Sequence, residues 1–236
     1  MYHPYLYSVS SVASSSVEDR TFWVNVVLSV ITLLAVLVAI FQEWLKRRWR
    51  RSSLDMIITM RPPDCHQIEL IDARTHAPAG KSIYIRIKII HQKGPSAEGV
   101  EVMISDFKKI NVSGQKTSIP SFLPMNLIWS HFQPRTHIVK IPPNIFRHCD
   151  LGHFFKVQDD GCLFILDTIV QPNPVANGMI PGLIQRGRYE FTLLLTGDNV
   201  TPLKKSWILE FDGSWSEDED EMLKKIKIYP IDESVT

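Results

Sequence analysis

The feature that most limits how this chain can fold is an apolar segment near its N-terminus, residues 22–41, which contains no charged side chain. Wound into a helix, the segment would be roughly 30 Å long, which matches the hydrocarbon thickness of a bilayer. In hydrocarbon every backbone polar group needs a partner within the segment, and a helix provides one. Aromatic side chains favour the membrane interfaces, so we expect one transmembrane helix with these residues toward its ends: Phe22, Trp23, Phe41 and Trp44.

The order of charges around the segment indicates a retained anchor and its direction. A signal peptide carries positive charge before its apolar region and small residues after it. Here Glu18, Asp19 and Arg20 come before the segment, and a basic cluster follows it: Lys46, Arg47, Arg48, Arg50 and Arg51. Because Lys and Arg in short flanks tend to stay in the cytoplasm, we expect the N-terminus outside and the C-terminal region in the cytoplasm. Anionic lipid would attract the same cluster.

The chain divides into three predicted regions. Residues 1–21 are rich in serine and predict a flexible tail. Residues 22–53 predict the transmembrane helix with a basic juxtamembrane extension, and residues 54–236 leave room for a folded domain of ordinary size.

One face of the predicted helix carries its polar side chains. Asn25, Ser29 and Thr32 are spaced i, i+4 and i+7, so they share this face. Membrane helices pack on one another through small and weakly polar residues, which makes this face a candidate contact for a homo-oligomer or for another membrane protein. Isolated residues of these types are also tolerated in a span that makes no such contact.

Charge and cysteine content exclude some functions for the C-terminal region. Lys and Arg outnumber Asp and Glu in residues 1–53, whereas the acidic residues are slightly in excess afterwards. A nucleic-acid-binding domain would be basic, so we expect no nucleic-acid partner. The chain has 3 cysteines, Cys65, Cys149 and Cys162. Such a sparse, odd set predicts no disulfide framework and fits a reducing compartment.

After residue 53 the apolar pattern changes to the period of two that is typical of strands. In residues 82–91 isoleucines alternate with polar or aromatic residues. A short helix is predicted from Ser216, with Ser216 and Glu219 as a capping box. Many short strands separated by Gly- and Pro-rich turns predict an all-β sandwich. The expected strands are residues 54–60, 67–71, 82–91, 99–107, 125–129, 137–141, 154–157, 162–170, 188–196 and 205–211, with a short closing strand at 225–229.

A resemblance to a known class of domains refines this fold. Residues 84–104 (YIRIKIIHQKGPSAEGVEVMI) resemble the paired strands of immunoglobulin-like prokaryotic adhesion and scaffold domains, with Ala97, Val100 and Val102 in the second strand. Ile141-Pro142-Pro143 and Gly213-Ser214-Trp215 are similar to motifs of uncharacterised single-span membrane proteins that carry one such domain. The resemblance covers roughly residues 54–230 and implies an immunoglobulin-like β-sandwich with no catalytic residue.

Two clusters could carry chemistry. His148, Cys149 and His153 are potential zinc ligands, but neither a Cys-x-x-Cys nor a His-Glu-x-x-His motif frames them. In a strand, moreover, Cys149 would face away from His148. The acidic residues between 212 and 221 could hold calcium, although helix capping explains them as well. We therefore expect no bound cofactor.

Two functions remain from different classes. The first is a membrane-anchored, non-catalytic β-sandwich module that binds or scaffolds a protein partner at the cytoplasmic membrane face. The alternative is a membrane-bound, metal-dependent enzyme that uses residues 148–153. The first is favoured because the candidate site residues lack the spacing that metal and catalytic motifs require. The motifs of common nucleotide enzymes and serine hydrolases are missing as well.

Overall fold

The computed structural model describes residues 12–49, 51–72, 74–119, 122–157, 161–170 and 183–231, and within the first helix it describes the side chains of residues 20–42. The chain forms two compact units, Met1–Arg50 and Arg51–Thr236, and each is described by itself.

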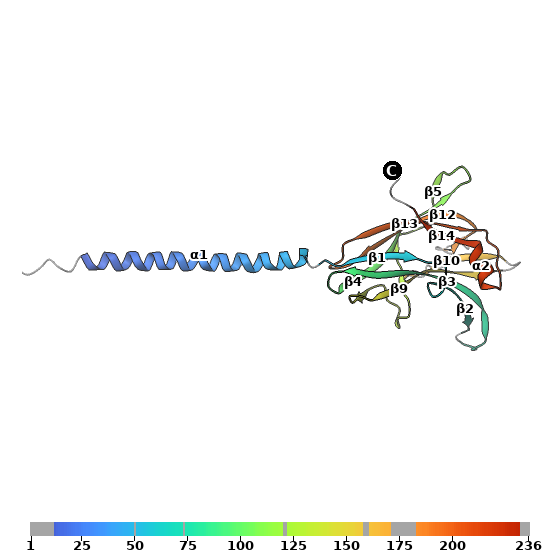
Figure 1. Ribbon diagram of the computed structural model, residues 1–236, viewed down its shortest axis with the longest axis horizontal. Coiled ribbons are helices and arrows are strands. Elements are labelled where there is room, and N and C mark those ends of the chain that lie inside the picture. The colour runs from blue at the N-terminus through green and yellow to red at the C-terminus, as the bar shows by residue number, and fades with distance from the viewer. Residues whose placement is uncertain are drawn as a thin grey trace, which may run out of the picture. The chain divides into compact units, whose positions relative to one another are not determined.

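The first unit contains helix α1, Val12–Trp49 (Figure 1). Its Arg20–Gln42 stretch is 23 residues long and apolar enough to cross a membrane, and its side chains are not buried against other described parts of the chain. The prediction of one N-terminal helix of membrane-spanning length and composition is confirmed. The direction in which the helix crosses stays a prediction.

Helix α1 starts earlier than the sequence predicted. Residues 12–21, expected as part of a flexible tail, are helical, while residues 1–11 lie outside the described part. No Gly or Pro interrupts residues 12–22, and extending a helix is easier than starting one, so the apolar helix continues backwards. Trp44, Lys46, Arg47 and Arg48 lie on α1 with their side chains outside the described part, Arg50 lies outside it altogether, and Arg51 is exposed.

The second unit consists of two antiparallel sheets, which confirms the predicted all-β fold behind an N-terminal helix. One sheet, called sheet 1, has the order β1-β3-β9-β10-β11, with β2 also on β3 and β7 on β9. Its strands are β1 (Ser53–Ile58), β2 (Cys65–Ile71), β3 (Pro78–Lys93), β7 (Ile128–Trp129), β9 (Phe146–Lys156), β10 (Cys162–Leu166) and β11 (Leu183–Ile184).

The other sheet, sheet 2, has the order β14-β13-β12-β4-β5, with β6 and β8 also on β4. Its strands are β4 (Ala97–Ile110), β5 (Lys116–Ser118), β6 (Met125–Asn126), β8 (Val139–Ile141), β12 (Gly187–Thr196), β13 (Leu203–Phe211) and β14 (Ile226–Pro230). Strands β3 and β4, which the sequence resemblance treats as paired, belong to different sheets, because the turn at Gly94 carries the chain from one sheet to the other.

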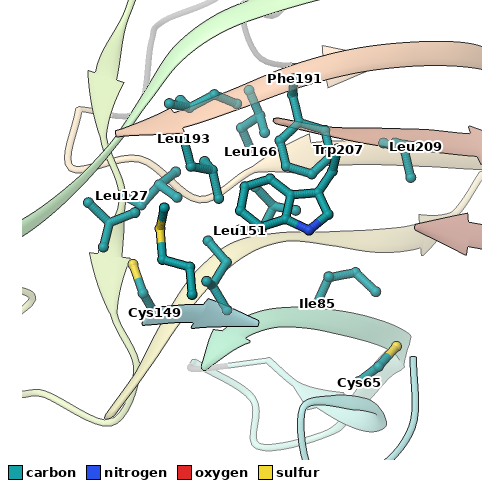
Figure 2. Packing of buried hydrophobic residues seen from close by; sticks show 14 of the residues in the cluster. Cys65, Ile85, Leu127, Cys149, Leu151, Leu166, Phe191, Leu193, Trp207 and Leu209 are labelled. Carbon is teal, nitrogen blue, oxygen red and sulfur yellow. The ribbon is translucent and has the colours of Figure 1, made fainter. Parts of the chain in front are cut away.

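The core lies between the two sheets. The alternating isoleucines of β3, Ile83, Ile85, Ile87 and Ile89, are all fully buried, as the period of two predicted. Figure 2 shows Phe191 and Trp207 of sheet 2 near Leu151 of sheet 1. The Phe191 and Trp207 rings stack with their centroids 5.7 Å apart.

The short helix α2, Glu219–Lys225, has a different cap from the predicted one. Asp218 is the N-cap, and its side chain accepts a hydrogen bond from the backbone N–H of Glu221. The predicted Ser216–Glu219 capping box is therefore wrong. Glu219 instead accepts a hydrogen bond from the backbone N–H of Gln67 on β2, at 3.0 Å, so a tertiary contact replaces the local one.

Hydrogen bonds from two distant turns fix Ser52, near the beginning of the second unit. Ser52 is fully buried, and its backbone N–H donates to the carbonyl of Asn199 at 2.7 Å. Its carbonyl accepts from the N–H of Thr201 at 3.0 Å, and its hydroxyl donates to the carbonyl of Pro95 at 2.7 Å. The turns after β3 and β12 thus both hold the start of β1.

Candidate functional site

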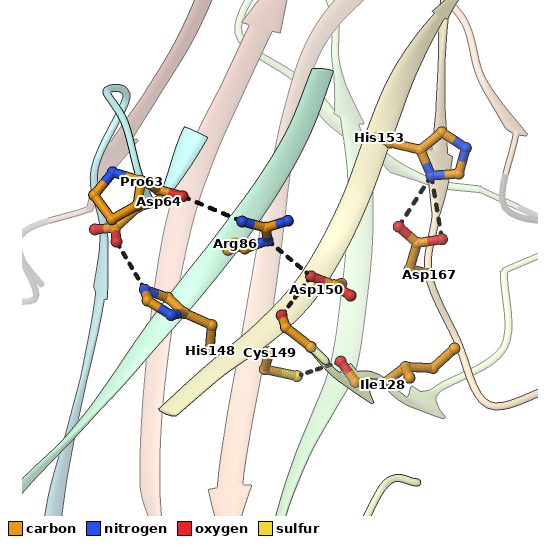
Figure 3. A network of polar contacts seen from close by, with 10 residues as sticks. Pro63, Asp64, Arg86, Ile128, His148, Cys149, Asp150, His153 and Asp167 are labelled. Atoms are coloured by element: carbon orange, nitrogen blue, oxygen red, sulfur yellow. Dashed lines mark hydrogen bonds and ion pairs between the residues drawn. The ribbon is translucent and has the colours of Figure 1, made fainter. Parts of the chain in front are cut away.

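Two surfaces of the sandwich bring polar side chains together. The first, which we call the polar band, lies on the outer face of sheet 1 and is drawn in Figure 3. It contains the histidines that the sequence singled out and their partners: Asp64, Arg86, Ser130, His148, Asp150, His153 and Asp167.

A β-bulge in β9 explains how the band forms. Arg86 of β3 lies opposite Asp150, but Ile85 lies opposite Gly152, so Leu151 is an extra residue on β9. A bulge shifts the alternation of side chains by one, which places His153 on the outer face with His148. Without it, His153 would share the buried face of Cys149.

Glycine is required at the bulge. A Cβ atom on Gly152 would lie 2.2 Å from the carbonyl oxygen of Ile165 and 2.6 Å from Cζ of Phe164. Real Cβ atoms do not approach a backbone oxygen so closely. The close pairing of β9 with β10 at this point therefore depends on Gly152.

Asp64 and His148 form one end of the band. Nε2 of His148 lies 2.8 Å from Oδ1 of Asp64, and the Asp64 side chain is only 7% exposed. Asp64 belongs to the loop between β1 and β2, and its carbonyl accepts a hydrogen bond from the backbone N–H of Arg86. The pair therefore fastens this loop to the middle of sheet 1.

Asp150 lies at the centre of the band. It accepts a hydrogen bond from the Ser130 hydroxyl at 2.5 Å, and Nε of Arg86 lies 3.4 Å from its Oδ1. Burial raises the pKa of Asp150, while the Ser130 hydrogen bond lowers it and the charge of Asp167 raises it again. Burial prevails, so this carboxylate is less favourable in the folded domain than in water.

His153 pairs with Asp167 at the other end. Its Nδ1 lies 3.0 Å from Oδ2 of Asp167, and its ring stacks on Tyr84 at a centroid distance of 4.8 Å. Burial raises the pKa of the Tyr84 phenol. Each histidine of the band thus has its own aspartate partner.

The structure does not bring His148, Cys149 and His153 together as metal ligands. Cys149 is fully buried in the core, where its Sγ donates to the carbonyl of Ile128 at 3.3 Å. Burial raises the pKa of its thiol well above the ordinary value, so it stays protonated at neutral pH and is a poor ligand and nucleophile. Across the described ranges, no group of three or more His, Cys, Asp or Glu side chains is arranged to hold a metal ion.

The acidic residues near α2 are also used locally. Asp212 accepts hydrogen bonds from the backbone N–H and the hydroxyl of Ser214, at 2.8 and 2.7 Å. Asp218 caps α2, and Glu217 accepts from Lys156 and from the Trp215 indole. These side chains serve turn and helix structure.

The second surface is a groove between the edges of β1 and β13, and sequence reasoning missed it. It has a volume of about 460 Å³. Buried Met56 and Trp207 contribute to its lining. The other lining residues, which complete what we call the edge groove, are Ile57, Ile58, Leu203, Lys204, Lys205, Ser206, Pro230 and Ile231.

The edge groove leaves strand edges without a neighbouring strand. Among the described strands, β1 pairs only with β3, and β14 pairs with β13 only from Trp207 onward. The last bond of that ladder runs from the N–H of Ile231 to the carbonyl of Ser206, at 2.9 Å. Backbone groups two residues apart point to the same edge, so those of Lys204 face the open side.

The two lysines of the groove differ. Nζ of Lys205 lies 2.5 Å from Oδ1 of Asp55 and donates to the carbonyl of Met56 at 3.2 Å, so it connects the two sheets across the groove. Lys204 is exposed and has no side-chain partner among the described residues. It leaves a free positive charge at the rim.

Comparison with models of known protein families gives no match, and a search of curated proteins gives none either. The functional argument therefore depends on the geometry of this chain alone.

Proposed function

We propose that this protein is a membrane-anchored, non-catalytic β-sandwich module that binds an extended segment of a protein partner at the cytoplasmic membrane face. The observation that carries the proposal is the edge groove, where an apolar lining lies beside two strand edges that no other described strand pairs with. An extended peptide can add to such an edge through main-chain hydrogen bonds and place alternate side chains in the groove. Natural sheets often protect an open edge with lysine, and Lys204 at this edge would at the same time attract an acidic segment.

The chemistry of the groove indicates the kind of segment that it would bind. Exposed Ile57 and half-buried Leu203 provide apolar contact area, and Lys204 provides a cation without a partner among the described residues. A strand that alternates apolar and acidic residues complements both features, because alternate side chains of a strand point in opposite directions.

The polar band supports a non-catalytic role. A His–Asp pair can orient a catalytic imidazole, but nucleophilic catalysis also needs a hydroxyl or thiol beside the free ring nitrogen. The described residues place no such group at Nε2 of His153 or at Nδ1 of His148. All three thiols are buried, and burial raises the pKa of Cys65 and Cys162 to about 12. We also propose that the sandwich is immunoglobulin-like, because two antiparallel sheets enclose one hydrophobic core.

The proposed orientation places the sandwich in the cytoplasm and the basic cluster against anionic lipid. Three free, buried cysteines without a disulfide suit a reducing compartment. The sequence also contains a natural reporter, the sequon Asn111-Val112-Ser113. It lies in the exposed turn between β4 and β5, whereas the amide of the other sequon asparagine, Asn199, donates to the carbonyl of Ser96 at 2.9 Å.

This reporter tests the orientation directly. We expect full-length protein synthesised with eukaryotic microsomes to carry no glycan on Asn111, while a sequon in an added N-terminal extension is glycosylated. Asn111→Gln is the matched control for any shift in mobility. Glycosylation at Asn111 would place the sandwich on the lumenal side and overturn the cytoplasmic orientation.

Site-specific photo-cross-linking tests the binding surface. A photoreactive amino acid replaces Ile57 or Lys204 in the groove, or Val112 in the exposed β4–β5 turn as control, in full-length protein in its native membranes. We expect a discrete cross-linked protein from the two groove positions and none from position 112. Equal products from all three positions, or none from the groove, would overturn the proposed binding site.

A further inference from the structure

The polar residues of the membrane-spanning stretch differ in whether their side chains are satisfied. The hydroxyl of Ser29 donates to the carbonyl of Asn25 at 2.8 Å, and the hydroxyl of Thr32 donates to the carbonyl of Leu28 at 2.8 Å. These two side chains therefore need no partner outside their own helix. The side-chain amide of Asn25, in contrast, has no hydrogen-bond partner among the described residues and is exposed on α1.

Asn25 also lies within the apolar layer. At a rise of about 1.5 Å per residue, it is about 8 Å from Arg20 and about 26 Å from Gln42, the two ends of the membrane-spanning stretch. Where that layer is hydrocarbon, leaving the donors and the acceptor of an amide unpaired is costly.

A second copy of this chain is the partner best matched to this amide. An asparagine side chain carries both donors and an acceptor, so two of them can satisfy each other. Copies of one chain insert in the same direction and place Asn25 at the same depth, which brings the two amides to one level in a parallel pair. Such a contact has the two-fold symmetry that most homo-oligomers use.

We propose that α1 self-associates as a parallel pair in the membrane and that Asn25 forms the interhelical hydrogen bonds. Ser29, one turn further along, is small enough to let the two backbones approach closely. The inference rests on the proposed membrane anchor. Pairing would place two edge grooves on one assembly, which strengthens binding to a partner with two suitable segments through effective concentration.

The test uses purified full-length protein, labelled with donor and acceptor dyes and reconstituted in synthetic phosphatidylcholine vesicles at increasing dilution. We expect energy transfer that falls with dilution for the wild type. Asn25→Leu should lower the association constant about threefold to thirtyfold, the range that interhelical polar contacts give. Asn25→Gln, which keeps the amide, should retain association. The double variant Ser29→Ala/Thr32→Val should also retain it, because those hydroxyls bond within their own helix.

Several outcomes would overturn the proposed pairing through Asn25, and the experiment distinguishes each of them from failure of the membrane anchor. If the protein does not partition into the vesicles at all, the membrane anchor itself is wrong. If it partitions but stays monomeric, or if Asn25→Leu associates as well as the wild type, the anchor stands and the pairing through Asn25 is wrong. A loss in the Ser29/Thr32 variant equal to that in Asn25→Leu would assign the contact to the whole polar face instead.

Discussion

The polar band and the edge groove lie on the same sandwich but differ in whether all of their charged side chains are paired. In the band, charged side chains from distant segments are paired and partly or fully buried, as for Asp64 with His148 and Asp167 with His153. In the groove, Lys204 and the edge of β13 are left without partners in the part of the chain that the structure describes. The density of titratable groups is therefore a poor guide to function here, because the histidines of the densest cluster are each paired with an aspartate. Among the described atoms of the band, only Nε of Arg86 is buried without a hydrogen bond.

This difference predicts two separable kinds of variant. Changes in the band should lower the free energy of unfolding and leave partner binding at the groove unaltered in the molecules that still fold. Changes at the groove rim should weaken partner binding and leave the free energy of unfolding nearly unaltered. The predictions below run from the largest expected effect on stability to the smallest.

Gly152→Ala should destabilise the sandwich most, by about 3 kcal/mol. The added methyl group would lie 2.2 Å from the Ile165 carbonyl oxygen, and backbone paired in the β9–β10 ladder cannot move away easily. Denaturant unfolding of the 51–236 unit measures the effect. Gly114→Ala, in the β4–β5 turn, is the comparison without a steric clash, because an added Cβ meets nothing within 4 Å there. Its φ of +81° adds a backbone strain that Gly152 does not have, so the comparison is a strict one. A loss for Gly152→Ala no larger than that for Gly114→Ala would contradict the steric account of the bulge.

Asp64→Ala should cost about 2 kcal/mol, because it leaves the side chain of His148 partly buried without its partner. The same denaturant titration measures it, and the double variant Asp64→Ala/His148→Ala completes the thermodynamic cycle. The double variant should lose less than the sum of the two single variants, since the second change removes the group that the first left unpaired. Strict additivity would show that the two residues do not interact.

Asp150 should give the band a pH dependence of known sign. Its folded-state pKa is raised above 3.8, mainly by burial, so protonation is more favourable in the folded domain than in the unfolded chain. Its contribution to stability is therefore complete below the unfolded pKa and is lost as the pH rises through the folded one. Relative to Asp150→Asn, the wild type should gain stability as the pH falls from 7 toward 4. A difference that stays constant or reverses over this interval would contradict the raised pKa.

How much of the fold and of the candidate site could be predicted from the sequence differs from element to element. Isoleucine alternation in β3 fixed which residues enter the core, because the period of two is a local property of a strand. The side-chain directions of His148 and Cys149 followed from the same rule. His153 did not, because one extra residue at Leu151 reverses the alternation, and no local pattern marks that bulge except the glycine after it.

The partners and the groove depend on contacts between distant segments. Asp64 and His148 are 84 residues apart, and nothing near either residue in the sequence specifies the other. The Ser216–Glu219 cap failed for the same reason, since Glu219 reaches His66 and Gln67 on β2. The groove exists because β14 stops opposite Trp207 while β13 continues to Leu203, and a difference in the lengths of two paired strands cannot be read from either strand alone.

Lys204→Glu should have the smallest effect on stability, within about 0.5 kcal/mol, because the side chain is exposed and makes no described contact. It should nevertheless weaken partner binding about tenfold, the size of one charge-assisted hydrogen bond. The yield of the cross-linked product from position 57 in native membranes measures this loss. Lys109→Glu, an exposed lysine on β4 outside the groove, makes the same change in net charge and should leave the yield unaltered. An equal loss in both variants would assign the effect to the overall charge of the domain. The difference between the paired side chains of the band and the unpaired Lys204 of the groove would then not explain where the partner binds.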